Sequence, residues 1–200
     1  MNRIATLACL LLLTPALDAH AAAIVGKPAP ALEARDADGK TVRLDAYKGK
    51  YVVLEWVNRQ CPFVRKHYGS GNMQSLQKKY TEKGVVWLSV CSSAPGKQGY
   101  VQGPEAKEWM AEEKAAPTDF LLDPKGKVGK AYGAKTTPHI FVIDPKGKVV
   151  YNGAIDDKPS TDREDIETAR NYLSAALDAS MAGKKVEVAA TQPYGCSVKY

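Results

Sequence analysis

Residues 51–64 read YVVLEWVNRQCPFV, an apolar run followed by a short polar turn and a Cys-Pro pair. The run is rich in β-branched and aromatic residues, which predicts a strand. Proline is favoured at the first position of a helix, so the sulfur of Cys61 is expected at a helix amino terminus. Backbone N–H groups there stabilise a thiolate, and Arg59, Arg65 and Lys66 add positive charge. The stretch predicts a strand, a turn and a helix with a reactive cysteine of lowered pKa; an inert turn cysteine is the alternative.

The rest of the chain alternates between short β-rich runs and amphipathic segments. Strands are predicted over residues 41–44, 51–57, 85–91, 119–122, 140–144 and 149–155. Apolar spacing predicts helices over residues 73–83, 104–115 and 162–181. Strands separated by helices imply parallel crossovers, whereas the last two strands are close enough only for a hairpin. The sequence therefore predicts an α/β fold with a mixed sheet. The hexapeptide DPKGKV occurs at Asp123 and at Asp144, which we interpret as a shared turn rather than a duplication.

The amino terminus has the parts of an export signal: a basic start at Arg3, an apolar run over residues 4–13 and small residues after it. The run is shorter than the roughly 20 apolar residues of a membrane span, and we expect no membrane partner. The protein is expected to be exported, to the periplasm if its source is a Gram-negative bacterium. We predict a signal peptide over residues 1–23, one domain over 24–183 and a carboxyl-terminal tail over 184–200.

The formal net charge is +6, but basic and acidic residues alternate without a basic block interleaved with aromatics. This pattern argues against a nucleic-acid partner. Loss of Cys9 with the signal leaves Cys61, Cys91 and Cys196, and an odd count allows one internal pair that suits redox chemistry better than a stabilising framework. The number of cysteines alone leaves three roles open for Cys196: a resolving thiol, a free thiol, or one half of an intermolecular disulfide bridge. For Cys91 a core position is favoured over an approach to Cys61.

Thr136, Thr137 and Pro138 directly precede the strand predicted at 140–144, where a cis bond would provide the bend that a proline needs. With the Cys-Pro turn, this resembles the thioredoxin superfamily, in which a cis-proline preceded by Thr or Val lies opposite the cysteine. The resemblance implies a thioredoxin-like fold, with a central mixed β-sheet flanked by helices.

Further segments resemble the redoxin branch, which includes peroxiredoxins and periplasmic thiol-disulfide reductases. They are GKPAP at 26–30, DGKTVRL at 38–44 and FVIDPKGK at 141–148. More narrowly, NRQCPFV at 58–64 and GCSVKY at 195–200 resemble an exported peroxiredoxin-like subfamily. The resemblance implies an amino-terminal redoxin extension, a carboxyl-terminal tail, and an antioxidant thiol-dependent oxidoreductase without a bound cofactor. It also implies Cys61 as nucleophile and Cys196 as resolving thiol.

The chain departs from its relatives at two places. Val64 stands where a thioredoxin-type motif has its second cysteine, so a resolving thiol must come from elsewhere. Peroxiredoxins hold peroxide with a proline and a Thr or Ser seven and three residues before the cysteine, where Leu54 and Asn58 stand here. Asn58 remains a candidate hydrogen-bond donor and Arg65 a candidate positive charge. The candidate substrate-binding residues are Asn58, Arg65, Thr137 and Pro138.

The leading hypothesis is that Cys61 reduces a peroxide or protein disulfide and passes the oxidation to Cys196. An external thiol or thioredoxin-like electron donor would restore both thiols. The alternatives are a periplasmic thiol-disulfide reductase that acts on protein disulfides, and a redox-silent or metal-binding module. His67 is expected on a helix surface and His139 is expected to face the thiol. The spacing of Cys and His lacks a compact ligand motif, so no metal site is predicted.

Overall fold

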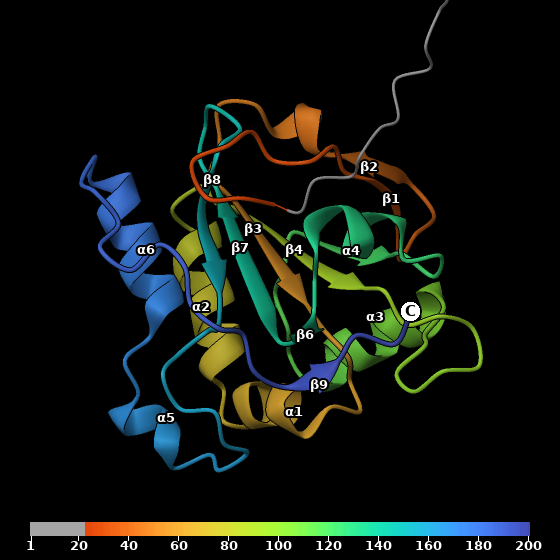
Figure 1. Cartoon of the computed structure of the whole chain (residues 1–200). Coiled ribbons are helices and arrows are strands. Elements are labelled where there is room, and N and C mark those ends of the chain that lie inside the picture. The colour runs from red at the N-terminus through yellow and green to blue at the C-terminus, as the bar shows by residue number, and fades with distance from the viewer. Residues whose placement is uncertain (1–22) are drawn as a thin grey trace, which may run out of the picture.

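The computed structural model describes residues 23–200 (Figure 1). The predicted export signal therefore lies outside the described residues, apart from Ala23. A seven-stranded sheet in the order β2-β1-β5-β4-β3-β7-β8 forms the centre. Its strands are β1 (Glu33–Asp36), β2 (Thr41–Arg43), β3 (Val52–Trp56), β4 (Val86–Cys91), β5 (Asp119–Leu122), β7 (His139–Ile143) and β8 (Val149–Gly153). Strands β3, β4 and β5 are parallel, while β1 and β7 flank them in the antiparallel direction. The predicted mixed sheet is confirmed.

Helices cover both faces of this sheet. One core layer contains residues of α1 (Pro62–Gly69), α2 (Asn72–Thr81), α3 (Gly103–Glu112) and α6 (Tyr172–Met181). The other contains residues of α4 (Lys127–Tyr132) and of the segment before β1. Two short turns complete the helices: η1 (Leu44–Tyr47) and α5 (Asp165–Thr168). Because β3 and β4 are covered on both faces, all their residues are buried, which explains their nearly continuous apolar sequence.

The predicted helix over residues 162–181 is wrong as a single helix. Ala169 has extended backbone angles, and α6 starts anew after Asn171, whose side chain accepts a hydrogen bond from the backbone N–H of Ser174. An asparagine cap satisfies one of the free N–H groups at a helix start. The cap and the extended residue split the segment into α5 and α6.

The repeated hexapeptide forms the same turn twice. The backbone N–H of Gly126 donates to the carbonyl of Asp123, and that of Gly147 donates to Asp144. The first copy leads into helix α4, whereas the second leads into strand β8. The turn is therefore local, while the element that follows depends on tertiary packing.

A second, two-stranded sheet joins β6 (Thr136–Thr137) to β9 (Cys196–Ser197) near the carboxyl terminus. Figure 1 shows the tail crossing from α6 to this point. Within residues 23–200, no helix has the length and apolar character required to cross a bilayer.

Candidate functional site

Cys61 sits at the start of helix α1, directly after the turn that follows β3. It occupies the N-cap position, with Pro62 as the first helical residue, and its side chain is fully buried. The Thr137–Pro138 peptide bond is cis, and the thiol of Cys61 donates to the carbonyl oxygen of Thr137 at 3.0 Å. The predicted positions of the cysteine at a helix start and of a cis-proline opposite it are confirmed.

The carboxyl-terminal tail brings a second thiol to this place. In the antiparallel pair β6–β9, Cys196 lies opposite Thr137. Gly195 has a φ of 127°, and a Cβ atom there would overlap the carbonyl group of Thr137, so only glycine allows this close approach. Cys61 and Cys196 are both free thiols, with Cys196 partly exposed.

The two thiols differ in acidity. Burial raises the pKa of the Cys61 thiol, but hydrogen bonds led by one from Cys196 outweigh it, so this pKa is lowered overall. Burial, the hydrogen bond to Cys61 and the charge of Cys61 raise the pKa of Cys196 to about 12. Cys61 therefore ionises first, while Cys196 keeps its proton and donates it toward the Cys61 sulfur. This asymmetry makes Cys61 the nucleophile of the pair.

Tyr194 anchors the tail two residues before Cys196. Its hydroxyl donates to the carboxylate of Asp156 and lies 3.1 Å from Nε2 of His67. Nδ2 of Asn72 lies 2.8 Å from the other ring nitrogen of His67. Because Tyr194 has one hydroxyl proton and the amide nitrogen only donates, Nε2 of a neutral His67 carries its proton and donates to Tyr194. Burial, followed by the charge of Lys66, lowers the pKa of His67 to about 3, which agrees with a neutral ring.

The prediction that His67 lies on a helix surface is wrong, because its side chain is completely buried under the tail. Sequence reasoning also missed Tyr194 as part of the site. The hydroxyl of Tyr194 and the ring of His67 come from positions 127 residues apart. An aromatic residue two positions before Cys196 was the one signal available in the sequence, and it did not identify a partner.

The tail is also fastened beyond Cys196. The backbone N–H of Val198 donates to Lys135, and the N–H of Ala94 donates to the carbonyl of Lys199. The hydroxyl of Tyr200 donates to the carbonyl of Ala134 at 2.9 Å. Anchors on both sides thus hold Cys196 against the active-site turn.

The side chain of Asn58 supports the turn before Cys61. Its amide nitrogen donates to the carbonyl of Gln98 at 3.1 Å, and its oxygen accepts from the N–H of Gln60 at 2.8 Å. Arg65 is exposed on α1, and its Nε donates to the carbonyl of Arg59 at 3.1 Å. Thr137 accepts the hydrogen bond from Cys61, and Pro138 follows it in the chain. Asn58 and Arg65 instead hydrogen-bond to backbone groups of the neighbouring loops. A role for the four residues in substrate binding stays a prediction.

The expectation that His139 faces the thiol is wrong. Nδ1 of His139 accepts from the N–H of Lys135 at 3.2 Å, and Nε2 lies 2.8 Å from Oδ1 of Asn152. Its ring packs against Phe141, in the core layer on the other side of the sheet from Cys61. Burial lowers the pKa of His139 to about 4.

Cys91 occupies the core, as favoured from the sequence. It is buried, its thiol donates to the carbonyl of Gly99 at 3.4 Å, and burial raises its pKa. This environment disfavours a thiolate, in contrast to that of Cys61. Between residues 23 and 200, no group of three or more His, Cys, Asp or Glu side chains is arranged to hold a metal ion.

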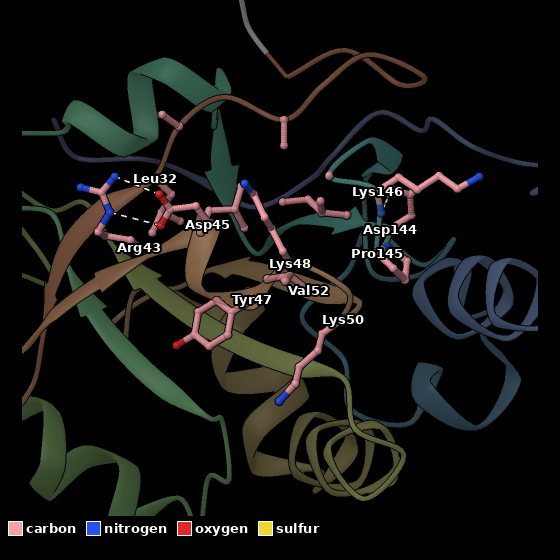
Figure 2. A pocket seen from close by; sticks show the side chains of 15 residues that line it. Leu32, Arg43, Asp45, Tyr47, Lys48, Lys50, Val52, Asp144, Pro145 and Lys146 are labelled. Atoms are coloured by element: carbon pink, nitrogen blue, oxygen red, sulfur yellow. Dashed lines mark hydrogen bonds and ion pairs between the residues drawn. The ribbon is translucent and has the colours of Figure 1, made fainter.

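A cavity of about 410 Å³ lies at the amino end of β3, opposite the end that leads to Cys61 (Figure 2). Leu32 and Val52 contribute apolar side chains to it, and Figure 2 shows Lys146 pointing away from the other labelled side chains. None of the candidate site residues lines this cavity. It is separate from the thiol chemistry.

Residues 25–152 match the model of the AhpC/TSA family. The chain belongs to this family. It is similar to the thiol-disulfide oxidoreductase ResA of Bacillus thuringiensis subsp. konkukian, with 31% identity over 117 residues, 52% of this chain and 66% of the relative. The match thus spans 66% of the length of that relative.

Two solved structures resemble the fold. An uncharacterized conserved protein from Geobacillus kaustophilus has 28% identity and a TM-score of 0.74, over 88% of this chain and 92% of that one. The thioredoxin domain of a thiol-disulfide oxidoreductase from Bacteroides vulgatus has 24% identity and a TM-score of 0.53, over 72% and 96%. The fold is thioredoxin-like, and the chain lies in the redoxin branch of the thioredoxin superfamily.

Proposed function

We propose that this protein is a thiol-dependent oxidoreductase in which Cys61 and Cys196 cycle between two thiols and one disulfide. The observation that carries the proposal is the placement of Cys196 opposite Thr137, whose carbonyl accepts the hydrogen bond of the Cys61 thiol at 3.0 Å, together with opposite shifts in the two pKa values. A low-pKa thiol beside a protonated partner is the arrangement that a nucleophile and its resolving thiol require.

Disulfide reduction is the leading reaction, and the likeness to ResA, named a thiol-disulfide oxidoreductase, supports it. The Cys61 thiolate attacks one sulfur of a substrate disulfide, whose S–S bond breaks as a mixed disulfide forms and one substrate thiolate leaves. Cys196 then loses its proton and attacks the Cys61 sulfur, which releases the second substrate thiolate. The substrate gains two electrons, and the protein is left with a Cys61–Cys196 disulfide. An external thiol or thioredoxin-like donor returns it to the reduced state.

Peroxide reduction, an antioxidant activity, is the second candidate. It is favoured by the complete burial of Cys61 under the tail, because a small oxidant reaches a covered sulfur more easily than a protein chain does. The Cys61 thiolate would attack a peroxide oxygen, form a sulfenic acid and release water or an alcohol. Condensation with Cys196 would release water and give the same disulfide.

We also propose that the protein acts after export, in the periplasm if the source is a Gram-negative bacterium. The basic, apolar and small-residue parts of residues 1–23 support export. On this proposal the mature protein has one domain over residues 24–183 and a tail over 184–200.

The test is a disulfide map by mass spectrometry of the reduced protein after brief oxidation, with substoichiometric hydrogen peroxide in one arm and a peptide disulfide in the other. We expect a Cys61–Cys196 bond that is absent in Cys61→Ser and Cys196→Ser and retained in Cys91→Ser. A faster reaction with the peptide disulfide indicates disulfide reduction, and a faster reaction with hydrogen peroxide indicates peroxide reduction. If Cys61 stays reduced in both arms, or pairs only with Cys91, the two-cysteine cycle is wrong.

A further inference from the structure

A second cavity of about 410 Å³ adjoins the active-site turn on the side of α1 and α3. Three arginines from different parts of the chain line it: Arg59 from the turn before Cys61, Arg65 from α1 and Arg163 from the loop before α5. Gln60, the residue next to Cys61, lines it as well. The cavity thus reaches the residue next to Cys61 in the sequence, while Cys61 and Cys196 themselves do not line it.

One hydrogen bond fixes Arg65, and a glycine makes room for Arg163. Nε of Arg65 donates to the carbonyl of Arg59, which fixes the Arg65 side chain along the turn and leaves its terminal nitrogens unused by this bond. The guanidinium of Arg163 occupies the space where Gly69 would carry a Cβ atom, so a side chain at position 69 would overlap it. The absence of a side chain at Gly69 therefore makes room for Arg163.

The positive charge of this cavity is offset only in part by the protein, because the arginines form no close ion pair in the part of the chain that the structure describes. Glu112 and Glu113 line it too, yet within residues 23–200 no carboxylate lies within 4.0 Å of a nitrogen of Arg59, Arg65 or Arg163. Guanidinium groups bind carboxylates through paired N–H donors. Three of them around one cavity are complementary to a ligand with carboxylate groups.

We propose that this cavity binds the carboxylates of a small anionic thiol that reduces the Cys61–Cys196 disulfide. The inference rests on the proposed function, because it names the class of electron donor for that same pair. The volume is within the roughly 300–1,000 Å³ of small-molecule sites, which favours a small thiol over a protein segment.

The reaction consumes two molecules of the thiol. The first, as a thiolate, attacks the partly exposed Cys196 sulfur, forms a mixed disulfide and breaks the Cys61–Cys196 bond. Cys61 leaves as a thiolate at the start of α1, where backbone N–H groups stabilise the negative charge. The second thiolate attacks the ligand sulfur of the mixed disulfide. The small thiol is released as its own disulfide, and Cys196 leaves as a thiolate that takes a proton from solvent.

The experiment measures the rate at which small thiols of different charge reduce the oxidised full-length protein, followed by acid quenching and mass spectrometry. The probes are glutathione and mercaptosuccinate as anions, 2-mercaptoethanol as a neutral thiol and cysteamine as a cation, each corrected for its thiolate fraction. We expect the anions to react about 10-fold faster than the neutral thiol at low salt, and this preference to fall at high salt.

The variants Arg65→Gln and Arg163→Gln should each lose most of the anion preference. Arg163→Gln, which lies outside the active-site turn, should also leave the 2-mercaptoethanol rate unchanged. Arg35→Gln is the matched control, because Arg35 is exposed on β1 and does not line the cavity. Equal rates for all three charge classes, or an anion preference that survives both variants, would overturn the inference while leaving the two-cysteine cycle intact. If no Cys61–Cys196 disulfide forms at all, the proposed function fails and this inference fails with it.

Discussion

Replacing Tyr194 by phenylalanine should release the tail from the domain while preserving its ring. The change removes the hydrogen bond to the carboxylate of Asp156 and the one from Nε2 of His67. A hydrogen bond to a charged group contributes about 1.5–3 kcal/mol and a neutral one about 1 kcal/mol, and Asp156 is buried. The ring, 5.8 Å from that of Phe63, still packs. We expect tail docking to weaken by about 2.5–4 kcal/mol, a factor of roughly 70 to 900.

The assay is the alkylation rate of Cys196 in the reduced protein, measured by peptide mass spectrometry. Release of the tail exposes the thiol and removes the contact with Cys61 that raises its pKa, so alkylation should accelerate by roughly the factor above. Tyr200→Phe is the control, because it removes one neutral hydrogen bond, to Ala134, worth about 1 kcal/mol or roughly 5-fold. If Tyr194→Phe reacts no faster than the wild-type protein, the buried network does not hold the tail.

Two further predictions concern the protonation of Cys61 and of Glu55. Cys196→Ala should raise the pKa of Cys61, because it removes the hydrogen bond that stabilises the thiolate. Cys196→Ser keeps a donor and should shift this pKa less, and the ultraviolet absorbance of the thiolate against pH measures both shifts. Burial raises the pKa of Glu55 despite hydrogen bonds that lower it, so the folded state holds a proton that the unfolded state loses near pH 4.5. Stability should therefore fall as the pH rises from there through the folded pKa, by at most about 1.4 kcal/mol per unit. Urea unfolding of Glu55→Gln between pH 4.5 and 8 should lack this component, and an unchanged slope would contradict it.

The central strands were predictable because they need only local information. Strands β3 and β4 are apolar along their whole length, since helices cover both faces, and β5 matches the prediction at both ends. Strand β1 escaped prediction because its sequence, EARD, has little β-propensity. Pairing with β2 and β5 makes it a strand, which is a tertiary effect.

The helices show the same division between local and tertiary information. Apolar spacing predicted α2 and α3 to within three residues at each end. Helix α4 was missed because the same hexapeptide precedes a helix at one site and a strand at the other. At 162–181 the spacing of apolar residues was continuous, but the cap at Asn171 divides the segment. Periodicity describes which face is buried and does not show where a helix restarts.

The active-site turn is a local feature and could be predicted, whereas the anchoring of the tail could not. Cys61 and Pro138 have recognisable neighbours in the sequence. Tyr194 reaches His67 and Asp156 only after the chain has folded, and none of the three stands in a pattern that links them. The tail of a domain is expected to fray unless something fastens it. The cysteine in the tail indicated that a fastening exists, without identifying its residues.

The position of Cys196 between two anchors bears on how the pair could cycle. Tyr194 is fixed on one side, and Val198, Lys199 and Tyr200 are fixed on the other, while the pairing of Cys196 itself covers only two residues. So short a pairing adds little stability of its own, and the segment between the anchors can open without loss of both ends. A resolving thiol needs both properties, because its sulfur must reach Cys61 to close the disulfide and become accessible when a donor opens it. Loosening an anchor therefore changes the rate at which Cys196 reaches Cys61, whereas the pKa of Cys61 depends on whether Cys196 is docked beside it.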